Sequence, residues 1–154
     1  MPTVVDSSGW IEFFVGGSNA DRFEKAIENT ADLVVPAISI TEVYRWVLRE
    51  SSQSDALTVA ALMRQGTIVP LDERLAVIAA EVSHRHRLSL GDGIIYATAL
   101  ETSAKLLTQY LRAAPDQKKL TKRRCRPAVA PQHQPQPPCH DPAAGHQRSV
   151  HRRK

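Results

Sequence analysis

Residues 1–114 of this 154-residue chain contain no cysteine, so no fold built from them depends on a disulfide. No stretch approaches the run of about 20 apolar residues that a membrane-spanning helix needs. The first residues, Met1-Pro2-Thr3-Val4-Val5-Asp6, lack the basic segment and the long apolar run of a secretory signal. These absences predict a cytoplasmic protein that does not enter a membrane.

Positive charge is also scarce in this part of the chain. Residues 1–114 contain 10 basic and 14 acidic residues, for a net charge of −4, whereas residues 115–154 contain 10 basic and 2 acidic residues, for +8. The net charge of +4 for the whole chain therefore describes neither part, and it argues against a uniformly basic nucleic-acid-binding domain. We predict one folded domain over residues 1–114, because this length suits a single hydrophobic core.

Periodic apolar patterns are absent from residues 115–154, which contain seven of the ten prolines and four of the six histidines. Such a segment buries too little apolar surface to offset the entropy of ordering the chain, so we predict a disordered C-terminal tail. The cysteines and histidines of the tail do not have the spacing of a zinc finger. Its basic run over 118–126 suits salt-sensitive contact with RNA phosphates.

Short apolar runs in the first 114 residues alternate with helical patterns. Strands are predicted over 3–5, 33–35, 67–71 and 105–108. Helices are predicted over 8–14, over 19–29, from Ser39 or Thr41 onward, over 54–65, after Asp72 and over 94–100, the last buried on all sides. This alternation indicates an α/β layer fold with a parallel sheet, in which ligands bind at the carboxyl ends of the strands.

Three acidic residues fall at strand ends or helix starts. Asp6 follows the first predicted strand, Glu42 lies in the first turn of a predicted helix, and Asp92 stands in a Gly-Asp-Gly turn. Carboxylates that converge on one cleft repel one another, and a hard divalent cation such as Mg²⁺ relieves that repulsion. The alternative is structural, with Asp6 and Asp92 as helix N-caps and Glu42 as a complement to the helix dipole. Spacing alone favours the structural interpretation without excluding the other.

The residues around these acids resemble the PIN-domain family, especially the VapC-type toxin ribonucleases. The matching segments are Val4-Val5-Asp6-Ser7-Ser8-Gly9-Trp10, Ser39-Ile40-Thr41-Glu42-Val43, Leu90-Gly91-Asp92-Gly93-Ile94 and Leu106-Leu107-Thr108. Four motifs in the family's order span residues 3–109. The resemblance implies a PIN-like three-layer α/β/α sandwich with a short central parallel sheet.

The resemblance also implies a metal-dependent endoribonuclease. Asp6, Glu42 and Asp92 would be ligands of Mg²⁺ or Mn²⁺ that organise the attacking water, and Ser8 would be a hydroxyl partner of Asp6 or of the metal. VapC-like proteins are usually homodimers that a cognate VapB-type antitoxin silences. Their substrates are RNAs, often tRNA or rRNA.

The sequence departs from the family pattern after the fourth strand. The family reads Leu-Thr-x-Asp there, whereas this chain has Thr108-Gln109-Tyr110 and no acid before Asp116. A tyrosine, with a pKa of about 10, cannot replace a carboxylate ligand near neutral pH, so we expect weakened activity. The alternatives are a catalytically impaired PIN-like module that binds antitoxin or RNA without cleavage, and a gene product that folds poorly. The change in composition near 109–115 is what a frameshifted 3′ end would produce.

Other side chains have simpler interpretations. The run His84-Arg85-His86-Arg87 predicts a solvated helix end that complements the helix dipole, with contact to RNA phosphates as the alternative. Trp10 and Trp46 lie on apolar helical faces, which predicts a place in the core or at a dimer interface.

Overall fold

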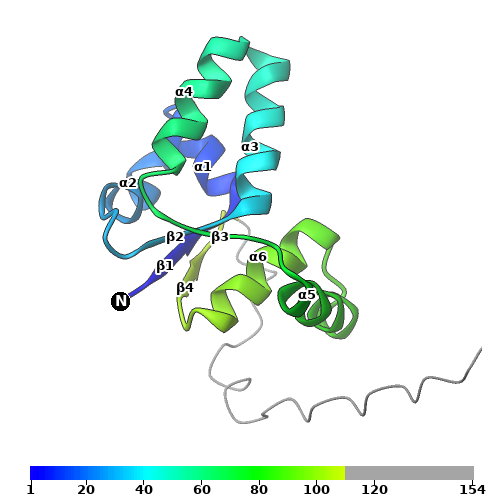
Figure 1. Cartoon of the computed structure of the whole chain (residues 1–154). Helices are drawn as coiled ribbons and strands as arrows, with labels where there is room; N and C mark the ends of the chain where they lie inside the picture. Colours follow the sequence, from blue (N-terminus) through cyan, green and yellow to red (C-terminus); the bar gives the residue numbers. More distant parts are fainter. Residues whose placement is uncertain (110–154) are drawn as a thin grey trace, which may run out of the picture. The chain divides into compact units, whose positions relative to one another are not determined.

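A computed structural model describes residues 1–109 of the chain, where short strands alternate with helices (Figure 1). Tyr110 and the predicted tail over 115–154 lie outside the described residues. The elements, in chain order, are β1 (Thr3–Val5), α1 (Ser7–Phe14), α2 (Ala20–Glu28), β2 (Leu33–Pro36), α3 (Ala37–Glu50), α4 (Gln53–Met63), β3 (Thr67–Val69), α5 (Glu73–His86), α6 (Leu90–Glu101) and β4 (Lys105–Leu107). The predicted strands and helices of this range are all present.

The strands of the described range form one parallel sheet in the order β3-β2-β1-β4. β1 is central, and its Val4 pairs with Val34 of β2 on one side and with Leu106 of β4 on the other. Parallel pairing brings the carboxyl ends of β1 and β4 together. Asp6 and Thr108, which follow these two strands, are therefore neighbours although 102 residues separate them.

Successive side chains of β1 point to opposite faces of the sheet, as the pleat requires. On one face Val5 packs with Trp10 of α1 and Phe23 of α2 in a core that extends over α3 and α4. On the other face Val4 packs with Ile95 of α6, and α6 packs in turn against α5. Helices cover both faces (Figure 1), which confirms the predicted three-layer sandwich.

The helix α3 begins earlier than predicted. Its N-cap is Pro36, the last residue of β2, and the helix starts at Ala37 with no connecting residue. Proline suits this junction because its fixed φ fits an extended residue and it has no N–H that needs a partner. Ser39 and Thr41, predicted as candidate caps, lie inside the helix, so that prediction is wrong. Glu42 consequently lies in the second turn of α3.

The helix α6 also begins earlier, at Leu90, so Gly91, Asp92 and Gly93 belong to its first turn and do not form a separate turn. Its N-cap is Ser89. The predicted burial on all sides is confirmed, since every residue from Gly93 to Ala99 is buried. None of the helices within residues 1–109 combines the length and the apolar character needed to span a membrane.

The predicted cap at Asp72 is confirmed. Its Oδ1 accepts a hydrogen bond of 2.8 Å from the backbone N–H of Leu75 in the first turn of α5. Ser52 caps α4 in the same way, through the N–H of Asp55 at 3.1 Å. Side-chain caps of this kind satisfy amide groups that the helix itself leaves unpaired.

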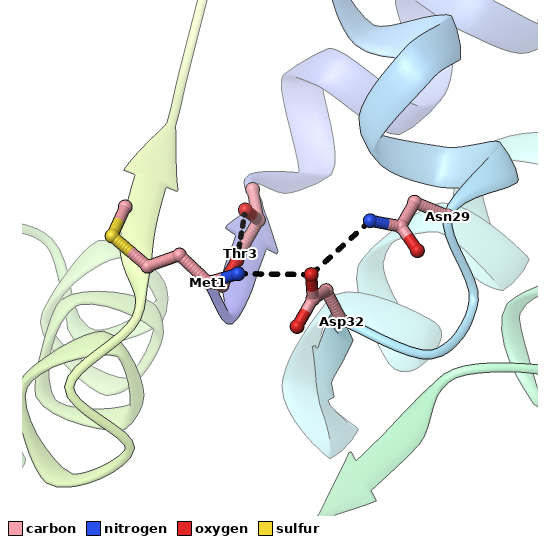
Figure 2. Close-up of polar contacts among 4 residues, drawn as sticks. All are labelled: Met1, Thr3, Asn29 and Asp32. Carbon is pink, nitrogen blue, oxygen red and sulfur yellow. Dashed lines mark hydrogen bonds and ion pairs between the residues drawn. The ribbon is translucent and has the colours of Figure 1, made fainter.

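Figure 2 shows how the first residue is attached beside β1. The Met1 ammonium group donates to Asp32 Oδ2 at 2.9 Å, and Asn29 Nδ2 donates to the same oxygen at 3.2 Å. The hydrogen bond from the Met1 ammonium and its positive charge lower the pKa of Asp32 below the ordinary value of 3.8, and Asn29 adds to this effect. These contacts join the start of β1 to the turn that precedes β2.

Candidate active site

Asp6 is the single residue between β1 and α1. Its extended backbone (φ −65°, ψ 154°) occupies the N-cap position of α1, yet its side chain accepts no hydrogen bond from the helix backbone. Asp6 Oδ2 accepts hydrogen bonds from Ser8 Oγ at 2.8 Å and from Thr108 Oγ1 at 2.9 Å. The N-cap interpretation of the Asp6 side chain is therefore wrong, while the predicted contact with Ser8 is present.

Glu42 is oriented by a residue from another helix. Its Oε2 accepts a hydrogen bond from Ser7 Oγ at 2.5 Å, and Ser7 is the first residue of α1. Because α3 has no acidic residue in its first turn, the interpretation of Glu42 as a first-turn complement to the dipole is also wrong. Glu42 is half-buried, and its carboxylate lies beside Gly91 at the start of α6.

Asp92 lies in the first turn of α6 but does not cap that helix. Ser89 is the N-cap, and its Oγ accepts from the backbone N–H of Asp92 at 3.2 Å while donating to Asp92 Oδ2 at 2.7 Å. The N-cap interpretation of Asp92 is thus wrong. Its exposed carboxylate lies at the positive end of a helix, where a negative charge is stabilised.

A small pocket brings two of the three predicted carboxylates together. Asp6 and Asp92 line it with five further residues: Leu88, Ile95, Tyr96, Leu106 and Thr108. Its volume is about 30 Å³, which is room for a water molecule or a small ion and not for a nucleotide. Glu42 does not belong to the lining, so the structure places it next to α6 and outside this pocket.

The donors available at the pocket are carboxylate and hydroxyl oxygens, which hard divalent cations such as Mg²⁺ and Mn²⁺ prefer. Asp6 and Asp92 fit such an ion in chemistry, and the pocket fits it in size. Within residues 1–109, no three His, Cys, Asp or Glu side chains lie close enough together to hold a metal ion. The roles of Asp6, Glu42 and Asp92 as ligands remain predictions.

Three hydroxyl groups of the site were not assigned a role from the sequence. Thr108, Ser7 and Ser89 each donate a hydrogen bond to one of the three carboxylates. The Ser89 contact could have been found, because a serine three residues before an acid at a helix start is a recognisable capping pattern. The Thr108 and Ser7 contacts depend on the strand order and on helix packing, which no local pattern contains.

The comparison with known families decides the identity of the fold. The family model described as PIN domain matches residues 3–109, which is more than half of the chain. This chain belongs to the PIN domain family. No curated protein sequence matches it at a significant level.

Solved structures similar to this PIN domain include toxin proteins. A toxin–antitoxin complex from Klebsiella pneumoniae is 19% identical with a TM-score of 0.61, over 72% of this chain and 88% of the other. VapC20 from Mycobacterium tuberculosis, described as a sarcin–ricin loop cleaving toxin, is 17% identical with a TM-score of 0.56, over 66% and 84%. PAE2754 from Pyrobaculum aerophilum is 15% identical with a TM-score of 0.55, over 72% and 76%. At these identities the likeness establishes a shared fold.

The last turn of α5 in this PIN domain is only partly solvated. His84, Arg85 and Arg87 are exposed, in agreement with the predicted solvated helix end. His86 is the exception, because its ring packs edge-on against Tyr96 with the ring centroids 5.8 Å apart. Tyr96 lines the pocket, so His86 packs against a residue of the pocket wall.

The position after Thr108 carries an amide in this PIN domain. Gln109 Nε2 donates to Glu12 Oε2 at 3.0 Å, which joins the end of β4 to α1. Gln109 is therefore occupied in a contact with α1 and brings no carboxylate to the pocket. Tyr110, where the family pattern places an acid, lies outside the described residues.

Proposed function

We propose that this PIN domain is a metal-dependent endoribonuclease of the VapC type, the toxin of a toxin–antitoxin pair. The observation that carries the proposal is the shared pocket of Asp6 and Asp92, together with the Asp6 side chain that does not cap α1. A carboxylate at the N-cap position that accepts no hydrogen bond from the helix backbone and lines a pocket instead is better explained by chemistry than by fold stability.

Asp6, Asp92 and Glu42 are the residues that would hold Mg²⁺ or Mn²⁺. When bound, such an ion supplies an activated water and stabilises the negative charge of a phosphate during in-line displacement. Ser8 and Thr108 fix the orientation of the Asp6 carboxylate by donating to the same oxygen, Oδ2.

The substrate is then RNA, with tRNA and rRNA as the candidates, and the natural inhibitor is a VapB-type antitoxin. Two of the similar structures support this choice, because one is a toxin–antitoxin complex and the other is a toxin that cleaves the sarcin–ricin loop. The homodimer and the cytoplasmic location remain predictions.

The test is RNA cleavage by the purified full-length chain with Mg²⁺ or Mn²⁺. We expect cleavage that EDTA abolishes and that Asp6→Asn and Asp92→Asn reduce by at least about 100-fold, because each removes a charged ligand. Asp21→Asn, at an exposed position on α2, is the matched control and should cleave like the wild type. Equal cleavage by all four proteins would refute the assignment.

The alternative function is a PIN domain that binds antitoxin or RNA without cleaving, and it is favoured by the tyrosine at position 110, where the family pattern has an acid. Tyr110→Asp separates the two functions. If the fourth acid contributes a ligand in the family's way, this substitution raises the cleavage rate of a weakened enzyme. RNA binding without cleavage by both wild type and Tyr110→Asp would instead support the binding module.

A further inference from the structure

Gly91 directly precedes Asp92 in the first turn of α6, and the space where its side chain would stand is occupied by Glu42. A Cβ built on residue 91 would come closer than 3.0 Å to Glu42 Oε1. The next nearest atoms to this Cβ are also atoms of the Glu42 carboxylate. Glycine at position 91 is therefore what allows the carboxylate to lie against the start of α6.

The other oxygen of Glu42 is fixed from a different helix. Ser7 Oγ donates to Glu42 Oε2 at 2.5 Å. Ser7 directly follows Asp6, and Gly91 directly precedes Asp92. The Glu42 carboxylate is thus enclosed between the two helix starts that bring the pocket carboxylates into place.

We propose that Gly91 is a positioning residue for Glu42. By leaving space beside Asp92, it lets the Glu42 carboxylate lie against the helix start that carries Asp92, where its negative charge adds to the attraction of Asp6 and Asp92 for a cation. This inference rests on the proposed function, because Glu42 is the third acid proposed to act on the cation. Gly91 itself touches neither cation nor substrate and acts only through Glu42.

The substitution Gly91→Ala should displace the Glu42 carboxylate and leave the rest of the fold in place. The atoms that a new methyl group would meet belong to the far end of a flexible side chain, so the Glu42 carboxylate can give way while the backbone stays in place. Alanine also favours a helix more than glycine does. We therefore expect Gly91→Ala to fold normally and to displace the carboxylate.

The experiment measures Mn²⁺ binding to the full-length chain by electron paramagnetic resonance, without RNA. Gly91→Ala should bind Mn²⁺ about tenfold more weakly than the wild type, as is typical when a residue that orients a ligand is changed. The matched control is Gly17→Ala, since a Cβ there would come equally close to the carboxylate of Glu12, which does not line the pocket. This control should bind Mn²⁺ like the wild type.

A double-mutant cycle shows whether Gly91 acts through Glu42. In a Glu42→Gln background, Gly91→Ala should cause no further loss of Mn²⁺ affinity, because the charge of the Glu42 carboxylate is already absent. Unchanged Mn²⁺ affinity of Gly91→Ala would overturn the inference, and so would an equal loss in both backgrounds or a Gly91→Ala chain that fails to unfold cooperatively on heating. If the wild type and Asp6→Asn bind Mn²⁺ equally, the proposed function itself fails, which is a separate outcome.

Discussion

The Ser7 hydroxyl donates a hydrogen bond of 2.5 Å to Glu42 Oε2 across 35 residues of sequence. Ser7 is buried at the first position of α1, and Glu42 lies in the second turn of α3. The contact joins two helices that emerge from neighbouring strands, β1 and β2. The hydrogen bond holds the Glu42 side chain in one orientation.

Substitution of Ser7 by alanine tests this contact. A hydrogen bond to a charged group contributes about 1.5–3 kcal/mol, so Ser7→Ala should lower the free energy of unfolding by up to that amount. The RNA cleavage rate should fall by about tenfold, as for other residues that orient a ligand. Ser54→Ala, at an exposed position on α4, is the control and should change neither quantity. Wild-type cleavage by Ser7→Ala would show that the orientation of Glu42 is unimportant.

Two substitutions of Thr108 distinguish the effect of its hydroxyl group from the effect of its side-chain volume. Thr108→Val keeps the volume and removes the donor to Asp6 Oδ2, so we expect a loss of cleavage of about tenfold. Thr108→Ser keeps the hydroxyl and should retain most of the activity. Steady-state cleavage of one RNA substrate by the two variants provides the comparison. Similar rates for serine and valine at this position would contradict the role of the hydroxyl.

Gly93 should govern stability through the packing of α5 on α6. A Cβ at this residue would collide with Ser83 Oγ and would lie 3.2 Å from the Ala79 carbonyl oxygen. Because a carbonyl on the α5 backbone cannot move aside, Gly93→Ala should lower the free energy of unfolding by about 1–3 kcal/mol. Urea denaturation measures this change. Ser54→Ala, at an exposed position on α4, serves as the control and should be as stable as the wild type.

The contact between Asp32 and the Met1 ammonium group should make the stability of the folded chain depend on pH in acid solution. Its pKa is lowered in the folded chain, chiefly by the hydrogen bond from the Met1 ammonium group, so its contribution is complete above the ordinary pKa of 3.8. That contribution disappears as the pH falls below 3.8 through the lower pKa of the folded state. The difference in melting temperature between wild type and Asp32→Asn should therefore shrink as the solution is acidified below this value.

Acetylation of the amino group is the control for the Asp32 variant. It removes the ammonium charge, so it should lower the melting temperature at neutral pH in the same direction as Asp32→Asn. Little further change is expected when the two alterations are combined. A full additive effect would show that Asp32 acts through another group.

The order of elements in residues 1–109 could be predicted because the strands are short, apolar and bounded by polar residues or proline. Leu33-Val34-Val35 followed by Pro36 is one example, and all four residues form a buried strand. The start of α3 could not be placed from the sequence, since Ser39 and Thr41 are better N-caps than proline by local preference. The direct passage from β2 into α3 depends on packing against both faces of the sheet.

The sequence identified the acidic residues of the candidate site but not the hydrogen bonds that hold them. Asp6, Glu42 and Asp92 were identified by position, and the structure brings Asp6 and Asp92 to one pocket. The structural interpretation of these acids failed because the cap of α6 is Ser89 and because the Asp6 side chain accepts a hydrogen bond from Thr108, which directly follows β4. That contact exists only because β4 pairs with β1, a long-range arrangement that local preferences do not contain.

The connections from β1 to α1 and from β2 to α3 are so short that they cannot take an inserted residue. One residue separates β1 from α1, and none separates β2 from α3. An α-helix turns by about 100° per residue, so the insertion of a single amino acid at either junction would rotate the following helix by more than a quarter turn. Ser7 and Glu42 would then point in different directions. The segment over 15–19 between α1 and α2 can change in length without rotating Ser7 or Glu42, whereas the two junctions tolerate substitutions and not insertions.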